Sequence, residues 1–343
     1  MLKKCLIFML ILLFFLTGNA LAVKKEVAEI YKAAEKEGQV VWSAVLREKE
    51  AKPIIKAFNE EHPKIKATYI RQHGGQAMER LMREIQVGQV SYDVIQIHSD
   101  YYTEFLKMDV IEKVNWKDFG VYPELIHPDN RFVNAFQAPF VFVYNHNLIK
   151  MEEAPKTWED FLDPKWKGKF ISDSRPSCYI RLTSAWGPEK VLDYLRQLAK
   201  NKPIFVRGST KAAALMAAGD YTMSVGMYLS SYVDVKNKGG PLSFAVPDPV
   251  PTAWYFYGIL KKGIQHPNAG KVFLGWLGTK GYKMMDKINW GRAVPYGGTR
   301  LEKLFKGKEL SYPPTPEQVP DRQKYSLDMV NALGLQKSKS KKK

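Results

Sequence analysis

Residues 138–170 read APFVFVYNHNLIKMEEAPKTWEDFLDPKWKGKF, and this stretch decides how the rest of the chain is interpreted. Residues 140–144 are β-branched or aromatic, which predicts a short buried strand. Thr157 precedes acidic residues and can cap a short helix, which ends at Asp163 because the next residue is a proline. A second strand begins at Phe170. A strand, a capped helix and another strand are a typical start for one lobe of an α/β protein.

The same stretch resembles the extracellular solute-binding proteins of ABC importers, a family that includes ferric-ion, thiamine, polyamine and phosphonate binders. Three motifs carry the resemblance: Tyr144-Asn145 at the end of the strand, PKTW at 155–158 and LDPKWKGK at 162–169. It extends more weakly over 39–295. The resemblance implies an α/β fold of the two-lobed periplasmic-binding-protein type II, with two crossover strands and a ligand cleft between the lobes. It also implies a protein that captures a solute by cleft closure and delivers it to a membrane permease.

The first lobe shows an alternation of strands and helices. Residues 39–42, 64–69 and 92–97 have the composition of strands, whereas 50–61 and 77–87 have apolar residues at helical spacing. This β-α-β-α-β order predicts an open α/β sheet. Ligands of such sheets bind beyond the carboxyl ends of the strands, where helix N-termini expose unpaired N–H groups.

Polar residues follow the predicted strands in both lobes. Arg175 lies in such a turn, where it can meet a carboxylate or phosphate with two parallel hydrogen bonds or form a surface salt bridge. Ser177 can cap the helix that follows. The predicted ligand-binding residues are Ser43, Ala44, His98, Ser99, Asp100, Ser172, Arg175, Ser177, Ser209, Thr210, Tyr228, Trp254 and Tyr255.

The N-terminus predicts export. Lys3 and Lys4 precede the apolar run 6–16, and small residues at Ala20 and Ala22 fit a cleavage site, which is the layout of a cleaved signal peptide. We therefore expect a periplasmic or extracellular monomer. The predicted division is a signal peptide at 1–22, lobe 1 at 23–138 and 250–300, lobe 2 at 139–249 and 301–335, and a basic disordered tail at 336–343.

The formal net charge is +17, and the lysines are scattered among glutamates instead of alternating with aromatic residues. This pattern predicts a solvated cationic surface and no nucleic-acid partner. A basic surface favours anionic ligands. We therefore predict a small anionic solute, such as an organic acid, a phosphonate or a sugar phosphate.

A ferric ion is the first alternative solute. The iron binders of the resembled family place adjacent tyrosines shortly after the strand that ends near residue 228, since phenolates are hard donors suited to Fe³⁺. Tyr228 and Tyr232 have three residues between them in this chain. A site of Tyr144, Tyr228 and Tyr232 remains an alternative, with Fe³⁺ as the transported ligand and no other metal site expected.

Two further alternatives concern other chemistries. A polyamine or thiamine would use Asp100 and Asp173 as charge partners and Trp254 as a stacking wall, although the positive net charge argues against a cationic solute. A secreted hydrolase is the alternative from another class. The chain has no HExxH, CxxC or GxSxG motif, so we predict no enzymatic activity and no resident cofactor.

Overall fold

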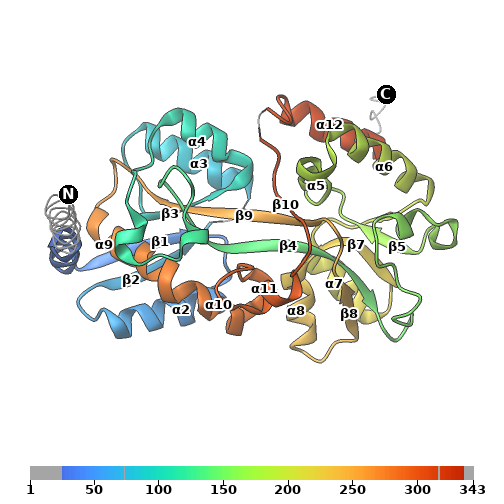
Figure 1. The fold of residues 1–343 in the computed structure, drawn as a ribbon, viewed down its shortest axis with the longest axis horizontal. Helices are drawn as coiled ribbons and strands as arrows, with labels where there is room; N and C mark the ends of the chain where they lie inside the picture. The colour runs from blue at the N-terminus through green and yellow to red at the C-terminus, as the bar shows by residue number, and fades with distance from the viewer. Residues whose placement is uncertain (1–24, 73, 316, 336–343) are drawn as a thin grey trace, which may run out of the picture. The chain divides into compact units, whose positions relative to one another are not determined.

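A computed structural model of the chain describes residues 25–72, 74–315 and 317–335 (Figure 1). The chain divides into two compact units. Unit 1 comprises residues 1–135 and 256–284, and unit 2 comprises residues 136–255 and 285–343. The predicted signal peptide and basic tail lie outside the described residues, so both stay predictions.

Unit 1 has the predicted alternation of strands and helices. Its strands β1 (Gln39–Ala44), β2 (Lys66–Arg71) and β3 (Val94–His98) are parallel, and β3 is followed in the sheet by β9 (Val250–Ile259), with the order β2-β1-β3-β9. Figure 1 shows α3 and α4 on one side of these strands and α2 on the other. The expected α/β class is thereby confirmed. The helices of this unit include one over residues 25–37 and α2 (Glu48–Glu61), α3 (Gly75–Gln86), α4 (Tyr102–Met108) and α9 (Pro267–Trp276).

Two long strands belong to both units. They are β4 (Val133–Asn145) and β9 (Val250–Ile259), and every residue of β4 is buried. The chain also passes between the units a third time within α10 (Tyr282–Asn289). Residues 285–300, which we assigned to lobe 1, therefore cluster with unit 2.

Unit 2 is built around β4, which is antiparallel to β7 (Met223–Tyr228) and β8 (Leu242–Ala245). Strand β5 (Phe170–Ser172) runs parallel to β7 and to β6 (Ile204–Phe205). Figure 1 shows α5, α6 and α12 on one side of these strands and α7 and α8 on the other. The remaining elements are α5 (Tyr179–Trp186), α6 (Pro188–Lys200), α7 (Ser209–Ala218), α8 (Leu229–Lys236), α11 (Arg300–Leu304), β10 (Leu310–Ser311) and α12 (Arg322–Ala332).

The stretch 138–170 folds largely as predicted, with one correction. Residues 140–144 lie in β4, and Thr157 Oγ1 accepts a hydrogen bond from Asp160 N at 3.2 Å. The helix after Thr157 is a 3-10 turn over Glu159–Leu162. It stays short because Pro164 holds Asp163 in an extended conformation, with φ −61° and ψ 125°.

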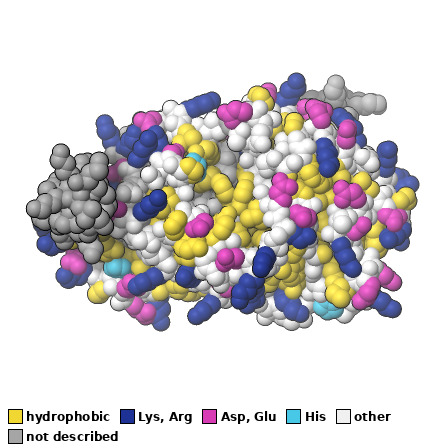
Figure 2. Space-filling model, in the orientation of Figure 1, with side chains coloured by type: hydrophobic (Ala, Val, Ile, Leu, Met, Phe, Trp, Pro, Cys, Tyr) yellow, Lys and Arg dark blue, Asp and Glu magenta, His cyan; other side chains and the backbone are white. Residues whose placement is uncertain are grey.

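Charged side chains cover the surface in a mixed pattern. Figure 2 shows Lys and Arg side chains spread over the visible face among Asp and Glu. Among the described residues, no helix has the length and apolar character needed to cross a membrane.

Gly226 in β7 yields a prediction about stability. Its φ is 73°, and a Cβ placed there would lie 2.5 Å from Cys178 Sγ, in the buried interior of unit 2. A left-handed backbone costs a non-glycine residue roughly 1–2 kcal/mol, and overpacking adds about 1–3 kcal/mol. We expect Gly226→Ala to lower the free energy of unfolding by about 2–5 kcal/mol in urea titrations.

Gly219 supplies the matched control for this prediction. Its φ is 93°, but no atom lies within 4 Å of the position its Cβ would occupy. Gly219→Ala should therefore cost only the roughly 1–2 kcal/mol of backbone strain. Equal losses in the two variants would show that the contact with Cys178 contributes nothing.

Candidate functional site

Unpartnered polar atoms gather at one end of the sheet of unit 1. Ser43 is 1% exposed at the end of β1, and its Oγ has no hydrogen-bond partner among the described residues. The same holds for the buried Oε1 of Gln72, directly after β2, and the buried Oγ of Ser99, directly after β3. A buried polar atom left unpaired costs about 1–3 kcal/mol. Three unpaired polar atoms at the ends of neighbouring strands indicate a site where these atoms form hydrogen bonds with a ligand or with water.

The loop after β1 is held in place by buried side chains. Gln96 Oε1 accepts hydrogen bonds from Val45 N at 2.8 Å and from Tyr257 Oη at 3.2 Å. Tyr69 Oη donates to the carbonyl oxygens of Ala44 and Leu46 at 2.7 and 2.5 Å. The backbone beside Ser43 is therefore fixed before any ligand arrives.

His98 and Asp100 bind each other in the loop after β3. His98 Nδ1 accepts a hydrogen bond from Asp100 N at 3.3 Å and lies 3.2 Å from Asp100 Oδ2. These contacts cap the 3-10 turn Ser99–Tyr101. A capping role accounts for both residues, and their contact with a solute stays a prediction.

Arg175 in unit 2 is oriented by Asp173. Its Nε and Nη2 donate to the two carboxylate oxygens of Asp173 at 3.0 and 2.7 Å, and Asp173 Oδ2 also accepts from Gly208 N at 3.2 Å. The hydrogen bond to Asp173 raises the pKa of Arg175, so the guanidinium stays charged. Asp173 uses two of the five N–H donors, and the side chain is 40% exposed, so other donors can reach a ligand.

The Arg175–Asp173 pair lies beside the start of α7. A cavity of about 10 Å³, room for about one water molecule, is lined by Asp173, Gly208 and Ser209 among others. Ser209 Oγ accepts a hydrogen bond from Tyr228 N at 3.2 Å, which ties the first residue of α7 to the end of β7. Thr210 is exposed on the same helix turn. Strand β5, strand β7 and α7 thus bring these residues together.

Other predicted residues serve the structure of unit 2. Ser172 Oγ is fully buried and bonded to Tyr179 Oη at 2.7 Å. The N-cap of α5 is Cys178, so the prediction that Ser177 caps this helix was wrong. The reason is that the helix begins one residue later than a Ser177 cap requires.

The predicted aromatic residues of unit 2 are packed against other rings. The ring of Tyr228 lies on Phe140 with 4.1 Å between centroids. Trp254 lies on Tyr312 at 4.0 Å, and Tyr255 is 5% exposed. Their contact with a solute stays a prediction.

The strand register separates two of the three tyrosines proposed as alternative iron ligands. Phe140 pairs with Tyr228 in the β4–β7 ladder and Tyr144 pairs with Met223, so Tyr144 and Tyr228 are separated by about 13 Å along the strands. Tyr232 is 7% exposed and packs on Phe244 at 4.7 Å. The register argues against Tyr144 and Tyr228 sharing one ion, and the tyrosine iron site stays a prediction.

Neither a metal-binding cluster nor the larger groove of unit 1 is a stronger candidate than the strand ends. Within the described ranges, no group of three or more His, Cys, Asp and Glu side chains could hold a metal ion. A larger groove of about 680 Å³ lies along α2 and β2 of unit 1. Two lysines that line it are paired with glutamates, Lys52 with Glu48 at 3.0 Å and Lys56 with Glu60 at 3.7 Å. With Arg71 included, three cationic side chains and two carboxylates line the groove, so most of its positive charge is compensated and it is a weaker candidate for an anion.

Comparison with known sequences identifies relatives of the chain. The family described as "Bacterial extracellular solute-binding protein" matches residues 53–295, more than half of the chain. An uncharacterized protein of Haemophilus influenzae is 30% identical over 135 residues, 37% of this chain and 38% of that protein. The Fe(3+)-binding periplasmic protein of Serratia marcescens is 22% identical over 205 residues, 56% of this chain. The chain thus spans 38% and 60% of the lengths of these two relatives.

Solved structures show the same fold. Iron-bound HitA from Pseudomonas aeruginosa has a TM-score of 0.66 and 18% identity, with 86% of this chain and 99% of that chain covered. The periplasmic binding protein AfuA from Actinobacillus pleuropneumoniae, with fructose-6-phosphate bound, has a TM-score of 0.65 and 20% identity, covering 87% and 99%. The family match and the shared fold confirm the resemblance found in residues 138–170. The chain belongs to the bacterial extracellular solute-binding protein family.

Proposed function

We propose that this protein is the solute-binding component of an ABC importer and that its solute is a small anion. The observation that carries the proposal is the Arg175 guanidinium, which Asp173 orients beside the start of α7. A guanidinium with available N–H donors binds a carboxylate or phosphate with charge-assisted hydrogen bonds. Organic acids, phosphonates and sugar phosphates carry such groups.

Groups on unit 1 support the same class of solute. The hydroxyls of Ser43 and Ser99 are buried and unpartnered, so they can donate hydrogen bonds to hydroxyl, carboxyl or phosphoryl oxygens. A solute that satisfies these atoms removes the cost of leaving them unpaired. The sugar phosphate in the structure of AfuA, a protein of the same fold, is consistent with this chemistry.

We further infer that the protein acts outside the cytoplasm and passes its solute to a membrane permease. The family match supports this inference. Capture by cleft closure, action as a monomer and the absence of a resident cofactor stay predictions. Binding without turnover accounts for the residues named above.

Ferric ion is the second candidate, because the relative from Serratia marcescens is an Fe(3+)-binding protein. The separation of Tyr144 from Tyr228 argues against a site built on all of the predicted tyrosines. A site that uses Tyr144, Tyr228 and Tyr232 stays a prediction.

The test is a thermal-shift panel on protein that has been partly unfolded and refolded to remove bound solute. The panel contains phosphate, phosphonates, sugar phosphates, dicarboxylates, spermidine, thiamine and ferric citrate. A ligand at one hundred times its dissociation constant adds about 2.7 kcal/mol to the free energy of unfolding. We expect a shift with an anion and none with the cations. A shift with ferric ion alone would favour the iron alternative, and turnover of an ester or phosphoester would favour the hydrolase.

A further inference from the structure

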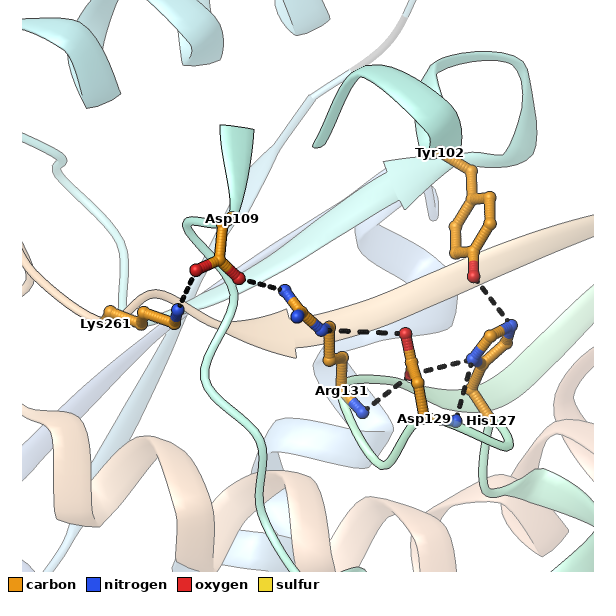
Figure 3. Close-up of polar contacts among 6 residues, drawn as sticks. All are labelled: Tyr102, Asp109, His127, Asp129, Arg131 and Lys261. Carbon is orange, nitrogen blue, oxygen red and sulfur yellow. Dashed lines mark hydrogen bonds and ion pairs between the residues drawn. The ribbon is translucent and has the colours of Figure 1, made fainter. Parts of the chain in front are cut away.

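Six polar side chains of unit 1 form a continuous network, which we call the α4 clamp (Figure 3). The network joins three parts of the sequence: helix α4, the turn before β4 and the chain just after β9. Its members are Tyr102, Asp109, His127, Asp129, Arg131 and Lys261.

The clamp fixes the first residue of α4. Tyr102 Oη and His127 Nε2 are 2.9 Å apart, and His127 Nδ1 lies 2.8 Å from Asp129 Oδ1. The carboxylate of Asp129 selects the tautomer with hydrogen on Nδ1, which leaves Nε2 to accept from the Tyr102 hydroxyl. Burial, and then the charge of Asp129, raises the pKa of Tyr102 to about 12, so this hydroxyl keeps its proton at neutral pH.

The clamp also fixes the last turn of α4. Asp109 is the C-cap residue of this helix, and its carboxylate accepts hydrogen bonds from Lys261 Nζ and Arg131 Nη1, each at 2.6 Å. These two hydrogen bonds lower the pKa of Asp109 to about 2, so the carboxylate stays ionised at neutral pH. Arg131 Nε lies 3.6 Å from Asp129 Oδ2 and thereby links the two ends of the clamp.

Rings around Tyr102 connect the clamp to the long strands. Its ring lies 5.6 Å from Phe132, the residue before β4, and 4.8 Å from Phe256 in β9. The ring of His127 meets both of these rings edge-on, at 5.9 and 5.7 Å. A movement of the Tyr102 ring would therefore also displace Phe132, just before β4, and Phe256 in β9.

The clamp adjoins the candidate solute loop. Tyr102 directly follows the turn Ser99–Tyr101, which contains the unpartnered hydroxyl of Ser99. The turn has only three residues, so fixing Tyr102 also limits the position of Ser99. The loop after β1 is supported by Gln96 and Tyr69, whereas the loop after β3 is supported by the His98–Asp100 contacts at its start and by the clamp at its end.

We propose that Tyr102 and His127 are positioning residues that hold the Ser99–Tyr101 turn in the conformation that binds solute. The proposal rests on the proposed function, because it assigns this turn to the solute site. It predicts that the hydroxyl of Tyr102 contributes to solute affinity without touching the solute.

The key variant is Tyr102→Phe, which removes the hydroxyl and keeps the ring packing. Loss of one hydrogen bond that orders the turn should weaken the affinity for the anion found in the panel by about 3- to 10-fold. Hydrogen exchange of the amides in 99–105 should become faster. Tyr325→Phe is the matched control, since Tyr325 is a buried tyrosine in α12 of unit 2 whose hydroxyl donates to Pro188 O at 2.7 Å. It should lose comparable stability but change neither affinity nor exchange in 99–105.

Two variants of His127 distinguish the effect of the Tyr102–His127 hydrogen bond on affinity from the effect of side-chain packing. His127→Gln retains an acceptor for the Tyr102 hydroxyl and should keep most of the affinity, whereas His127→Leu should behave like Tyr102→Phe. Faster exchange in Tyr102→Phe with unchanged affinity would overturn the proposal while leaving the proposed function intact. If the wild type binds no anion of the panel, the proposed function fails. Exchange in 99–105 then decides whether the clamp holds this turn, and unchanged exchange overturns the clamp as well.

Discussion

Replacing Arg175 by alanine is expected to weaken binding of an anionic solute by about 10- to 150-fold. A hydrogen bond to a charged group contributes roughly 1.5–3 kcal/mol, which corresponds to this range of dissociation constants. The substitution also leaves the carboxylate of Asp173 uncompensated beside the bound anion, and Asp173 is only 12% exposed. Isothermal titration with the anion found in the panel measures the loss directly.

Arg196→Ala is the matched control for this prediction. Arg196 also pairs with an aspartate of unit 2, Asp193, but lies on the surface of α6 with its side chain 57% exposed. It removes the same charge from the same unit, so a general electrostatic effect would appear in both variants. Affinity that falls equally in both, or in neither, would contradict the role assigned to Arg175.

The largest effect on stability is expected from Trp158→Ala. Trp158 is fully buried, packs edge-on against Phe142 at 4.8 Å and against Tyr194 at 5.9 Å, and donates from Nε1 to Pro249 O at 3.1 Å. Removing a buried tryptophan leaves a cavity and costs about 3–5 kcal/mol. Guanidinium chloride unfolding should show this decrease in the free energy of unfolding.

Trp158→Phe tests how much of the Trp158 contribution to stability comes from ring packing and how much from its hydrogen bond. Phenylalanine retains part of the ring packing but leaves Pro249 O without its donor, so the loss should be smaller than for alanine. Solute affinity under native conditions should remain close to that of the wild type, because Trp158 lies in the core and not at the strand ends. A loss below 1 kcal/mol in Trp158→Ala would show that this core collapses around the missing ring.

Local sequence patterns predicted most of the architecture. The apolar run 140–144 became part of β4, and the alternation in unit 1 appeared in the expected order. Ser43 and Ser99 followed from the same reasoning, because polar residues at the carboxyl ends of parallel strands lie on one edge of the sheet. Gln72 occupies the same kind of position after β2, and the same rule makes its loop a candidate, although the set of predicted ligand-binding residues does not include it.

Contacts between distant residues could not be predicted in this way. Ser172 was expected at the site because it ends a strand, but the hydroxyl of Tyr179 takes its hydrogen bond in the core. Tyr232, one of the alternative iron ligands, packs against Phe244, a contact that the sequence did not indicate. The bond between Tyr102 and His127 spans 25 positions in the sequence. The periodicity of apolar residues predicts which face of a helix or strand is buried. It does not predict which side chain, distant in the sequence, contacts that face.

The central claim is that the solute binds at the carboxyl ends of the strands of each unit. Hydrogen exchange of the wild-type protein, with and without a saturating anion from the panel, tests this claim most directly. We predict slower exchange in 43–47, 98–102, 173–178 and 207–211, since these segments contain the candidate groups. Slower exchange confined to other segments, such as the groove along α2 and β2, would contradict the account.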